Sequence, residues 1–455
     1  MRFLQNGADS TLAVEIAIKY LEDKEITNAG FGSNLNINGV VEGDATIVDH
    51  LGRSGACGAV PGEETTQSRD GANVTANNMS KGIGNPISLA NLIREASIKP
   101  LSLCRVSPNI LVGIGARKFA EEHGMPSVMN ELLVSRNAKY RFEQWYRDLV
   151  DAEAKINTAL GADGDIQHSD ASSPGTEPQA RSPLGCLSPN PSARPSPHPR
   201  MHLQTDELSP DGPIAHGSST IGDYTPDGGD GYPETKGLIH EYPNPNEDRP
   251  WRNDSARFRE TRDEEQDVDM VDDTVGAIAI DLMGHIAAGS SSGGIGMKHE
   301  GRVGPAALVG IGTAVIPLDP DDEDGVSVAA VTSGTGEHMA TSFASHKCAE
   351  RLYHSSRRGQ GGHNIAEYDD DAVIESFVTV DFMGHPGVRS QPTPGAIGVM
   401  AVKQTHAGYY FYFAHNTESF ALASMASTEP QPLCTMSRAG KAGGVIRGGR
   451  KVHIN

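Results

Sequence analysis

The sequence predicts a single layered α/β domain that a long polar insertion divides into two parts. The chain has 455 residues, of which 37% are apolar and 5% aromatic, so it cannot bury a core along its whole length. The 25 acidic and 10 basic residues between Asp151 and Asp273 carry 15 of the 21 net negative charges, and 15 of the 28 prolines lie between Pro174 and Pro250. We therefore expect residues 158–268 to be a disordered, solvated insertion between two structured parts, 1–157 and 269–455.

In the first part, the sequence predicts helices on either side of a short β segment. Apolar residues recur at a spacing of three to four from Ala8 to Leu21, which is typical of an amphipathic helix. A loop rich in Gly and Asn follows at 27–34, and alternating residues from Val40 to Val48 predict a hairpin. Two more helices are expected near Pro86–Ala96 and Pro108–His123. The polar residues 61–80 interrupt this part as a surface insertion.

The second part opens with two apolar strands, Thr274–Asp281 and Ile286–Ser292, joined by a turn at Met283–His285. A helix is expected after Gly336, and further strands are expected at Ser327–Thr332, Gly395–Val402 and Tyr409–His415. Strands precede and follow helices in both parts, which favours one layered domain over two separate ones.

Composition argues against several classes of function. No apolar run approaches the roughly 18–20 residues of a membrane span, and the acidic balance argues against binding nucleic acid or anionic lipid. No signal pattern opens the sequence. The cysteines are odd in number and widely spaced, which predicts reduced thiols in the cytoplasm or nucleus; they are Cys57, Cys104, Cys186, Cys348 and Cys434. No transition-metal site is expected, because the spacing of His354, His363, His385 and His406 matches no set of metal ligands.

A threonine at the end of the insertion has the setting of an amino-terminal nucleophile. The acidic run ends at Asp273, and the apolar strand starts at Thr274. A threonine hydroxyl needs a base, and a free α-amine with a pKa of roughly 7.7–8.0 is such a base when threonine begins a chain. Cleavage between Asp273 and Thr274 would create that residue. The structural alternative is a threonine that only caps or packs its strand.

Five short motifs occur along the chain in the same order as in a known family of enzymes. They are Thr27-Asn28-Ala29-Gly30, Asp272-Asp273-Thr274-Val275-Gly276, Ser291-Ser292-Gly293-Gly294, Gly301-Arg302-Val303-Gly304 and Thr332-Ser333-Gly334-Thr335-Gly336-Glu337-His338. Outside the insertion, the sequence resembles the amino-terminal-threonine hydrolases of the asparaginase type 2 family. Among the members of that family, it is most similar to the threonine aspartases. The resemblance implies the amino-terminal-nucleophile (Ntn) hydrolase fold, an αββα sandwich of two stacked sheets between helical layers.

The resemblance also implies a role for each matching residue. Thr274 corresponds to the nucleophile, both for self-cleavage after Asp273 and for later turnover. The remaining assignments are Ser292 as the hydroxyl that hydrogen-bonds the nucleophile, Ser333 and Gly334 as the oxyanion-hole pair, and Asn28 as the residue beside the threonine amine. The structural alternatives are a solvated strand-end serine for Ser292, over which the adjacent Gly293-Gly294 turn favours the functional role, and a turn former for Asn28.

Arg302 corresponds to the residue that binds the substrate carboxylate, for which a guanidinium fork is suited. Asparaginases of this family carry an acidic residue after Arg-Val-Gly that pairs with the amine of free asparagine, whereas this sequence has Pro305. The resemblance therefore favours an endopeptidase that cleaves protein substrates after Asp. It further implies a homodimer of αβ units, and a structural sodium ion in the loop before Asn28 with no other cofactor.

Two other functions stay open at this point. An L-asparaginase or isoaspartyl peptidase of the same family is the first alternative. The family begins with a buried strand ahead of its first helix, whereas this sequence starts at Met1 inside that helix. The second alternative is therefore a truncated, inactive relative that binds partners through its acidic Pro/Ser-rich insertion.

Overall fold

The computed structural model describes residues 1–60, 81–162, 274–439 and 444–452. The described residues form one compact unit within 1–166 and 266–455. All elements below belong to this unit. The predicted insertions, 61–80 and nearly all of 158–268, and also Asp273, lie outside the described residues.

The first five-stranded sheet has the order β4-β2-β1-β7-β6. Its strands β6 and β7 come from the start of the second part of the chain, and the other three come from the first part. Its pairs are antiparallel apart from β2 and β4, which are parallel. The predicted strands at 274–281 and 286–292 are confirmed as β6 and β7. The strands are β1 (Gly43–Val48), β2 (Ser54–Val60), β4 (Ile110–Val112), β6 (Val275–Ile280) and β7 (Ile286–Ser292).

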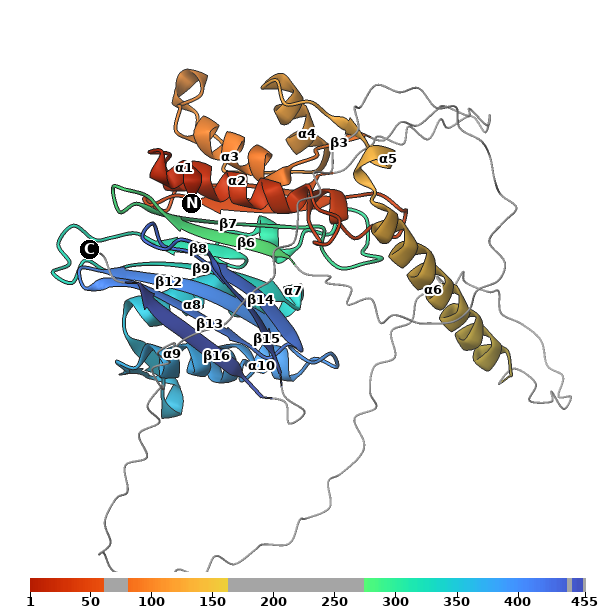
Figure 1. Ribbon diagram of the computed structural model, residues 1–455. Coiled ribbons are helices and arrows are strands. Elements are labelled where there is room, and N and C mark those ends of the chain that lie inside the picture. Colours follow the sequence, from red (N-terminus) through yellow and green to blue (C-terminus); the bar gives the residue numbers. More distant parts are fainter. Residues whose placement is uncertain (61–80, 163–273, 440–443, 453–455) are drawn as a thin grey trace, which may run out of the picture. The chain divides into compact units, whose positions relative to one another are not determined.

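A second five-stranded sheet has the order β16-β13-β12-β9-β8, and all its pairs are antiparallel. Its strands are β8 (Thr313–Ile316), β9 (Ser327–Gly334), β12 (Ile397–Thr405), β13 (Gly408–His415) and β16 (Ile446–Val452). The two sheets stack face to face (Figure 1). Their shared core contains Ile286 and Ala288 from β7 against Ala329 and Val331 from β9, because alternate residues of a strand point to the same face.

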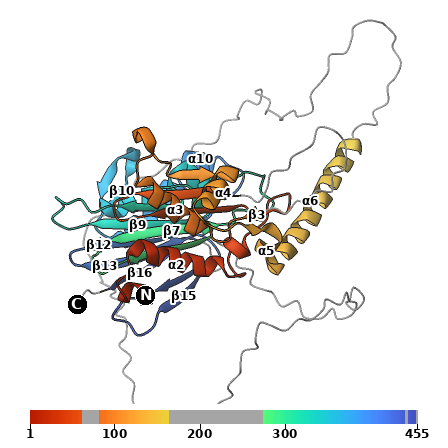
Figure 2. The same ribbon diagram turned by 90° about the horizontal axis from the view of Figure 1, so that it is seen from above.

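Helices cover the outer face of each sheet, as Figures 1 and 2 show. On the first sheet lie α2 (Ser10–Glu22), α3 (Pro86–Ser97) and α4 (Gly113–Glu122). The Asp9 side chain caps α2 by accepting from the Leu12 amide at 2.8 Å. On the second sheet lie α8 (Ala344–Tyr353), α9 (Asp370–Ser376) and the π-helix η5 (Phe377–Phe382). This order of layers confirms the predicted αββα sandwich.

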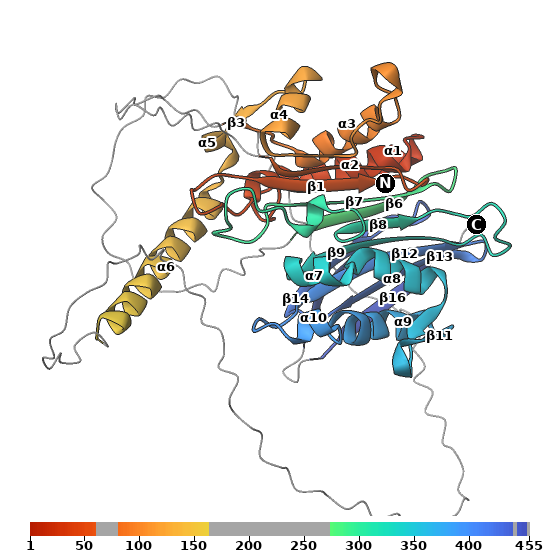
Figure 3. The same ribbon diagram turned by 180° about the vertical axis from the view of Figure 1, so that it is seen from behind.

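Shorter elements complete the unit, and α6 projects away from the sheets (Figure 3). The remaining helices are α1 (Arg2–Gln5), α5 (Asn130–Leu133), α6 (Arg136–Ala162), α7 (Gly336–Ser342) and α10 (Pro386–Arg389). Two-stranded sheets pair β3 (Lys81–Gly82) with β5 (Val128–Met129), β10 (Ser356–Arg358) with β11 (Asn364–Ala366), and β14 (Ser419–Ser424) with β15 (Leu433–Arg438). The 3-10 turns are η1 (Gly30–Gly32), η2 (Ser102–Cys104), η3 (Pro305–Ala307) and η4 (Gln360–Gly362).

Some local predictions were wrong. The β1 strand forms its hairpin with β2, not within Val40–Val48, and Val41 bridges to Leu35 instead. The expected helix at Pro108–His123 begins only at Gly113, because Ile110–Val112 extends to pair with β2. The pattern also missed α6, which is polar along most of its length and passes the expected boundary at residue 157. No helix in the described part of the chain is long and apolar enough to cross a membrane.

Candidate functional site

The two hydroxyl residues predicted at the junction lie side by side. Thr274 immediately precedes β6, and Ser292 ends the neighbouring antiparallel strand β7. Thr274 Oγ1 donates to Ser292 Oγ at 2.9 Å, and Ser292 Oγ also accepts from the Gly294 amide at 3.0 Å. Ser292 is buried, whereas Thr274 is half-buried. Antiparallel pairing thus brings together residues 18 positions apart.

Asn28 is tied to the turn that follows Ser292. Its Nδ2 donates to the Gly294 carbonyl at 2.8 Å, its Oδ1 accepts from the Asn34 amide at 2.9 Å, and its carbonyl accepts from the Gly293 amide at 2.8 Å. A methyl group on Gly293 would lie 2.6 Å from Asn28 Oδ1, so only glycine allows this approach. The Nδ2 end of this side chain therefore fixes the loop at 27–34 against the Ser292 turn, and the Oδ1 end holds the loop itself together through Asn34.

Arg302 lies in the loop after β7 and pairs with a carboxylate of the same chain. Its Nε and Nη2 donate to Glu337 Oε1 at 3.0 and 2.9 Å. Three glycines make room for the guanidinium group. A methyl group would lie 3.0 Å from Nη1 at Gly294, 2.9 Å from Nη1 at Gly304, and 2.6 Å from Nη2 at Gly336. Arg302 therefore touches both the Ser292 turn and the start of α7.

A buried group of charged residues lies next to Arg302. Lys298 Nζ donates to the Glu42 carbonyl at 2.7 Å and lies 4.0 Å from Glu42 Oε2. Asp44, opposite Ser292 in the β1–β7 pairing, accepts from the Ala59 and Gly304 amides, both at 2.8 Å. Burial lowers the pKa of Lys298 and raises the pKa of Glu42 and of Asp44, and the opposite charges only partly offset it. Because Glu42 Oε1 also accepts from the Gly301 amide at 2.9 Å, the two carboxylates together fix the loop that carries Arg302.

Ser333 and Gly334 end β9, the strand of the second sheet that packs against β6. They pair with Gly398 and Ile397 of β12, and Gly334 has a φ of 145°, which favours glycine. Val331, earlier in β9, lies against β6, because a methyl group on Gly276 would be 3.0 Å from its Cγ2. Neither Ser333 nor Gly334 makes a hydrogen bond with Thr274 among the described residues.

The loop before Asn28 gathers backbone carbonyl oxygens around Gly32. A methyl group on Gly32 would lie 1.9 Å from the Thr27 oxygen, 2.8 Å from that of Lys24 and 2.9 Å from that of Glu25. Hard cations take oxygen ligands of this kind. The sodium ion expected in this loop stays a prediction. Among the described residues, no three His, Cys, Asp or Glu side chains gather where they could hold a metal ion.

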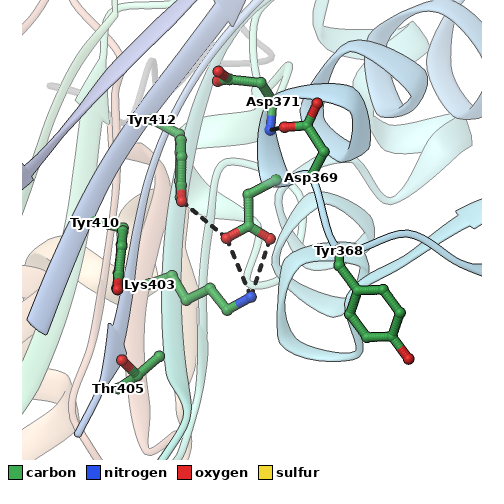
Figure 4. Close-up of a pocket in the computed structure, with 8 residues that line it drawn as sticks. Tyr368, Asp369, Asp371, Lys403, Thr405, Tyr410 and Tyr412 are labelled. Carbon is green, nitrogen blue, oxygen red and sulfur yellow. Dashed lines mark hydrogen bonds and ion pairs between the residues drawn. The ribbon is translucent and has the colours of Figure 1, made fainter. Parts of the chain in front are cut away.

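An open pocket on the second sheet lies apart from these residues. It has a volume of about 410 Å³ and is lined by Lys403 and Tyr412 with residues 368–371, among others (Figure 4). Asp370 forms an ion pair with Lys403 at 3.0 Å and accepts a hydrogen bond from the Tyr412 hydroxyl at 2.9 Å. None of the residues predicted for the site lines it.

The sequence did not single out Glu337, Glu42 or Asp44 as site residues. Their signal in the sequence is weak, because single acidic residues are common in a chain with 59 of them. Only the fold brings these pairs together, because Glu337 is 35 positions from Arg302 and Glu42 is 256 positions from Lys298 in the sequence.

Comparison with known proteins finds similarity to asparaginases. A family model described as asparaginase matches residues 1–176 and 230–405. The chain is 35% identical over 163 residues to the isoaspartyl peptidase/L-asparaginase of Homo sapiens, covering 36% of this chain and 44% of that protein. The corresponding protein of Xenopus laevis is 33% identical over 159 residues (35% and 41%), and a plant-type L-asparaginase of Pyrococcus horikoshii is 38% identical over 152 residues (33% and 39%). The chain thus spans less than half the length of these curated relatives.

Proposed function

The chain belongs to the asparaginase type 2 family of Ntn hydrolases, and we propose that it is a self-processing threonine endopeptidase that cleaves protein chains after Asp. The hydrogen bond from Thr274 Oγ1 to Ser292 Oγ carries this proposal. This bond fixes the hydroxyl of Thr274, the residue that would become amino-terminal if the chain were cleaved after Asp273.

Self-cleavage uses the same oxygen as turnover. Thr274 Oγ attacks the carbonyl carbon of Asp273, the Asp273–Thr274 peptide bond breaks, and its nitrogen takes a proton to become the α-amine. Water then hydrolyses the resulting ester and releases the carboxyl end of Asp273 and a chain that begins with Thr274. In later turnover this α-amine is the base for Oγ. Donors at Ser333 and Gly334 would stabilise the oxyanion, where each donor contributes about 3–4 kcal/mol.

Arg302 would select the substrate through its carboxylate. Its guanidinium lies between Gly294, which follows Ser292, and Gly336, which follows the Ser333–Gly334 pair. An aspartate side chain held there would lie beside the turn that follows Ser292, the hydrogen-bond partner of Thr274. Pro305 stands where asparaginases of the family carry the acid that pairs with a free α-amine. A residue inside a protein chain has no such amine, which supports the endopeptidase.

An L-asparaginase or isoaspartyl peptidase is the second candidate. The similar proteins, isoaspartyl peptidase/L-asparaginases and a plant-type L-asparaginase, favour it. One contact does so as well, because Glu337 supplies a carboxylate beside Arg302, and the residue before it, Gly336, packs against Pro305. That carboxylate could replace the missing acid and bind the amine of asparagine.

Mass spectrometry of the full chain tests self-processing. We expect the wild type to yield a fragment that begins at Thr274, and Thr274→Ala to remain intact. Thr274→Ser keeps the hydroxyl and should still be cut. Thr379→Ala is the matched control, because its hydroxyl only bonds the Glu375 carbonyl of the preceding turn at 2.9 Å, and it should be processed normally. An intact wild-type chain would refute self-processing.

Substrate assays of the processed protein separate the two candidates. The endopeptidase should cut a peptide with an internal Asp and leave the matching Asn peptide uncut. The second candidate should instead release ammonia from asparagine or aspartate from a β-aspartyl dipeptide. Activity on these small substrates without peptide cleavage would overturn the endopeptidase and favour the asparaginase.

A further inference from the structure

The guanidinium group of Arg302 already holds a carboxylate, and that carboxylate belongs to the chain itself. Glu337 lies in the first turn of α7. Arg302 Nε and Nη2 both donate to its Oε1, at 3.0 and 2.9 Å, and Oε2 takes no part. A carboxylate that met the guanidinium side-on would use both oxygens in two parallel bonds, the stronger arrangement. Glu337 therefore makes a one-oxygen contact with a group suited to a two-oxygen one.

Burial differs sharply between the two partners. The Arg302 side chain is 14% exposed, whereas that of Glu337 is 64% exposed. Glu337 can therefore turn into solvent without uncovering a core. Arg302 cannot follow it, because Gly294, Gly304 and Gly336 surround its guanidinium closely. The mobile member of the pair is thus the carboxylate.

Arg302 also has an unused donor. Its buried Nη1 has no hydrogen-bond partner among the described residues, and a buried donor without a partner is costly. Glu337, on the Nε and Nη2 side of the guanidinium, leaves this donor unsatisfied. The partial burial of the Glu337 carboxyl raises its pKa, but the hydrogen bonds and charge of Arg302 outweigh that effect and keep the pKa below its ordinary value. Glu337 is therefore ionised at neutral pH.

We propose that Glu337 is a displaceable stand-in for the substrate carboxylate. It occupies Arg302 in the free enzyme and leaves when an aspartate side chain binds Arg302 through two oxygens. This inference rests on the proposed role of Arg302 in binding substrate. Each carboxylate ligand must then replace the Glu337 contact, so Glu337 weakens binding and sets the KM without taking part in bond cleavage.

Two variants test the stand-in in the full chain. Glu337→Gln keeps the shape and removes the charge, and Glu337→Ala removes the contact. After mass spectrometry has confirmed processing, we expect both to lower the KM for an Asp peptide about two- to fivefold, the range for replacing an exposed ion pair, with kcat unchanged. Glu367→Gln is the matched control. It breaks another Glu–Arg pair, with Arg357 at 3.0 Å, and should leave the KM unchanged.

Calorimetric titration with succinate, a dicarboxylate probe, gives a second readout that needs no turnover. The Kd for succinate should fall about two- to fivefold in both Glu337 variants and stay constant in Glu367→Gln. A Kd and KM that rise would mean that Glu337 positions Arg302, and unchanged values would make it a bystander; either result overturns the inference. A wild type that hydrolyses no Asp peptide would instead refute the proposed function, and the titration would still decide on Glu337.

Discussion

Thr274 Oγ1 lies 2.9 Å from Ser292 Oγ, and this hydrogen bond joins the start of β6 to the end of β7. The same Ser292 oxygen accepts from the Gly294 amide, and the Gly294 carbonyl accepts from Asn28 Nδ2. The proposed nucleophile is thereby connected to the loop at 27–34 through one turn. A change at Ser292 should consequently act on Thr274 directly.

Loss of the Ser292 hydroxyl should slow self-processing more than it affects folding. Ser292→Ala removes the partner of Thr274 Oγ1, and a hydrogen bond that strengthens as charge develops is lost at a cost of about tenfold to a hundredfold in rate. The release of the Thr274 fragment over time, followed by mass spectrometry, measures this. Ser290→Ala is the control in the same strand, because its hydroxyl bonds Thr313 Oγ1 at 2.7 Å instead. Equal rates in both variants would argue against a role for Ser292.

Close packing around Arg302 should make Gly336 intolerant of a side chain. Gly336→Ala would place a methyl group 2.6 Å from Arg302 Nη2 and 2.9 Å from Pro305 Cδ. Because the guanidinium must shift, the KM for an Asp peptide should rise at least about tenfold, as for a lost charge-assisted hydrogen bond. Steady-state kinetics check this. Gly115→Ala, where a methyl group meets nothing within 4 Å, should leave the KM unchanged.

The sequence predicts the parts of the fold whose signals are local. The strands β6 and β7 read directly as apolar runs either side of a turn, and the junction after Asp273 stands out because charge changes abruptly there. By contrast, β2 consists of small residues, Ser54-Gly55-Ala56-Cys57-Gly58-Ala59-Val60. These carry little β propensity of their own, and the strand forms because β1 and β4 pair with it on both sides.

Long-range polar contacts are the part of the site that the sequence could not predict. Pairing of Arg302 with Glu337, and of Lys298 with Glu42, depends on how two sheets and their loops meet. No periodicity encodes a contact between residues 256 positions apart. The family resemblance supplied the candidate residues, but it did not indicate which carboxylates face them.

The buried Lys298 should contribute strongly to stability. Lys298→Met removes the donor to the Glu42 carbonyl and takes a buried cation away from Glu42 and Asp44, of which Asp44 keeps Arg302 nearby. Breaking a buried charge pair costs about 3–5 kcal/mol. Urea denaturation should therefore show a large loss in the free energy of unfolding. The double variant with Glu42→Gln should recover part of it. Lys347→Met, whose partner Glu350 is a partly exposed residue of α8, is the control and should lose no more than about 1 kcal/mol; a similar loss in both single variants would contradict the prediction.

The fully buried Glu22 should make stability fall as pH rises. Burial raises the pKa of its carboxyl from 4.5 to about 8, although Ser291 Oγ donates to it at 2.6 Å and the Ile87 amide at 3.0 Å. Between these values the unfolded chain has lost the proton and the folded chain keeps it. The unfolded state therefore binds fewer protons, and a higher pH favours unfolding, by up to about 1.4 kcal/mol per pH unit.

Glu22→Gln should remove this contribution, because an amide does not titrate. Urea denaturation at pH 5, 6.5 and 8 should show the free energy of unfolding of the wild type falling relative to that of the variant. Taking the difference between the two proteins cancels the other titrating groups. Glu121→Gln, which removes an exposed carboxyl of α4, is the charge-matched control. A constant difference between wild type and Glu22→Gln across the three pH values would show that Glu22 has the same pKa in the folded and unfolded chain.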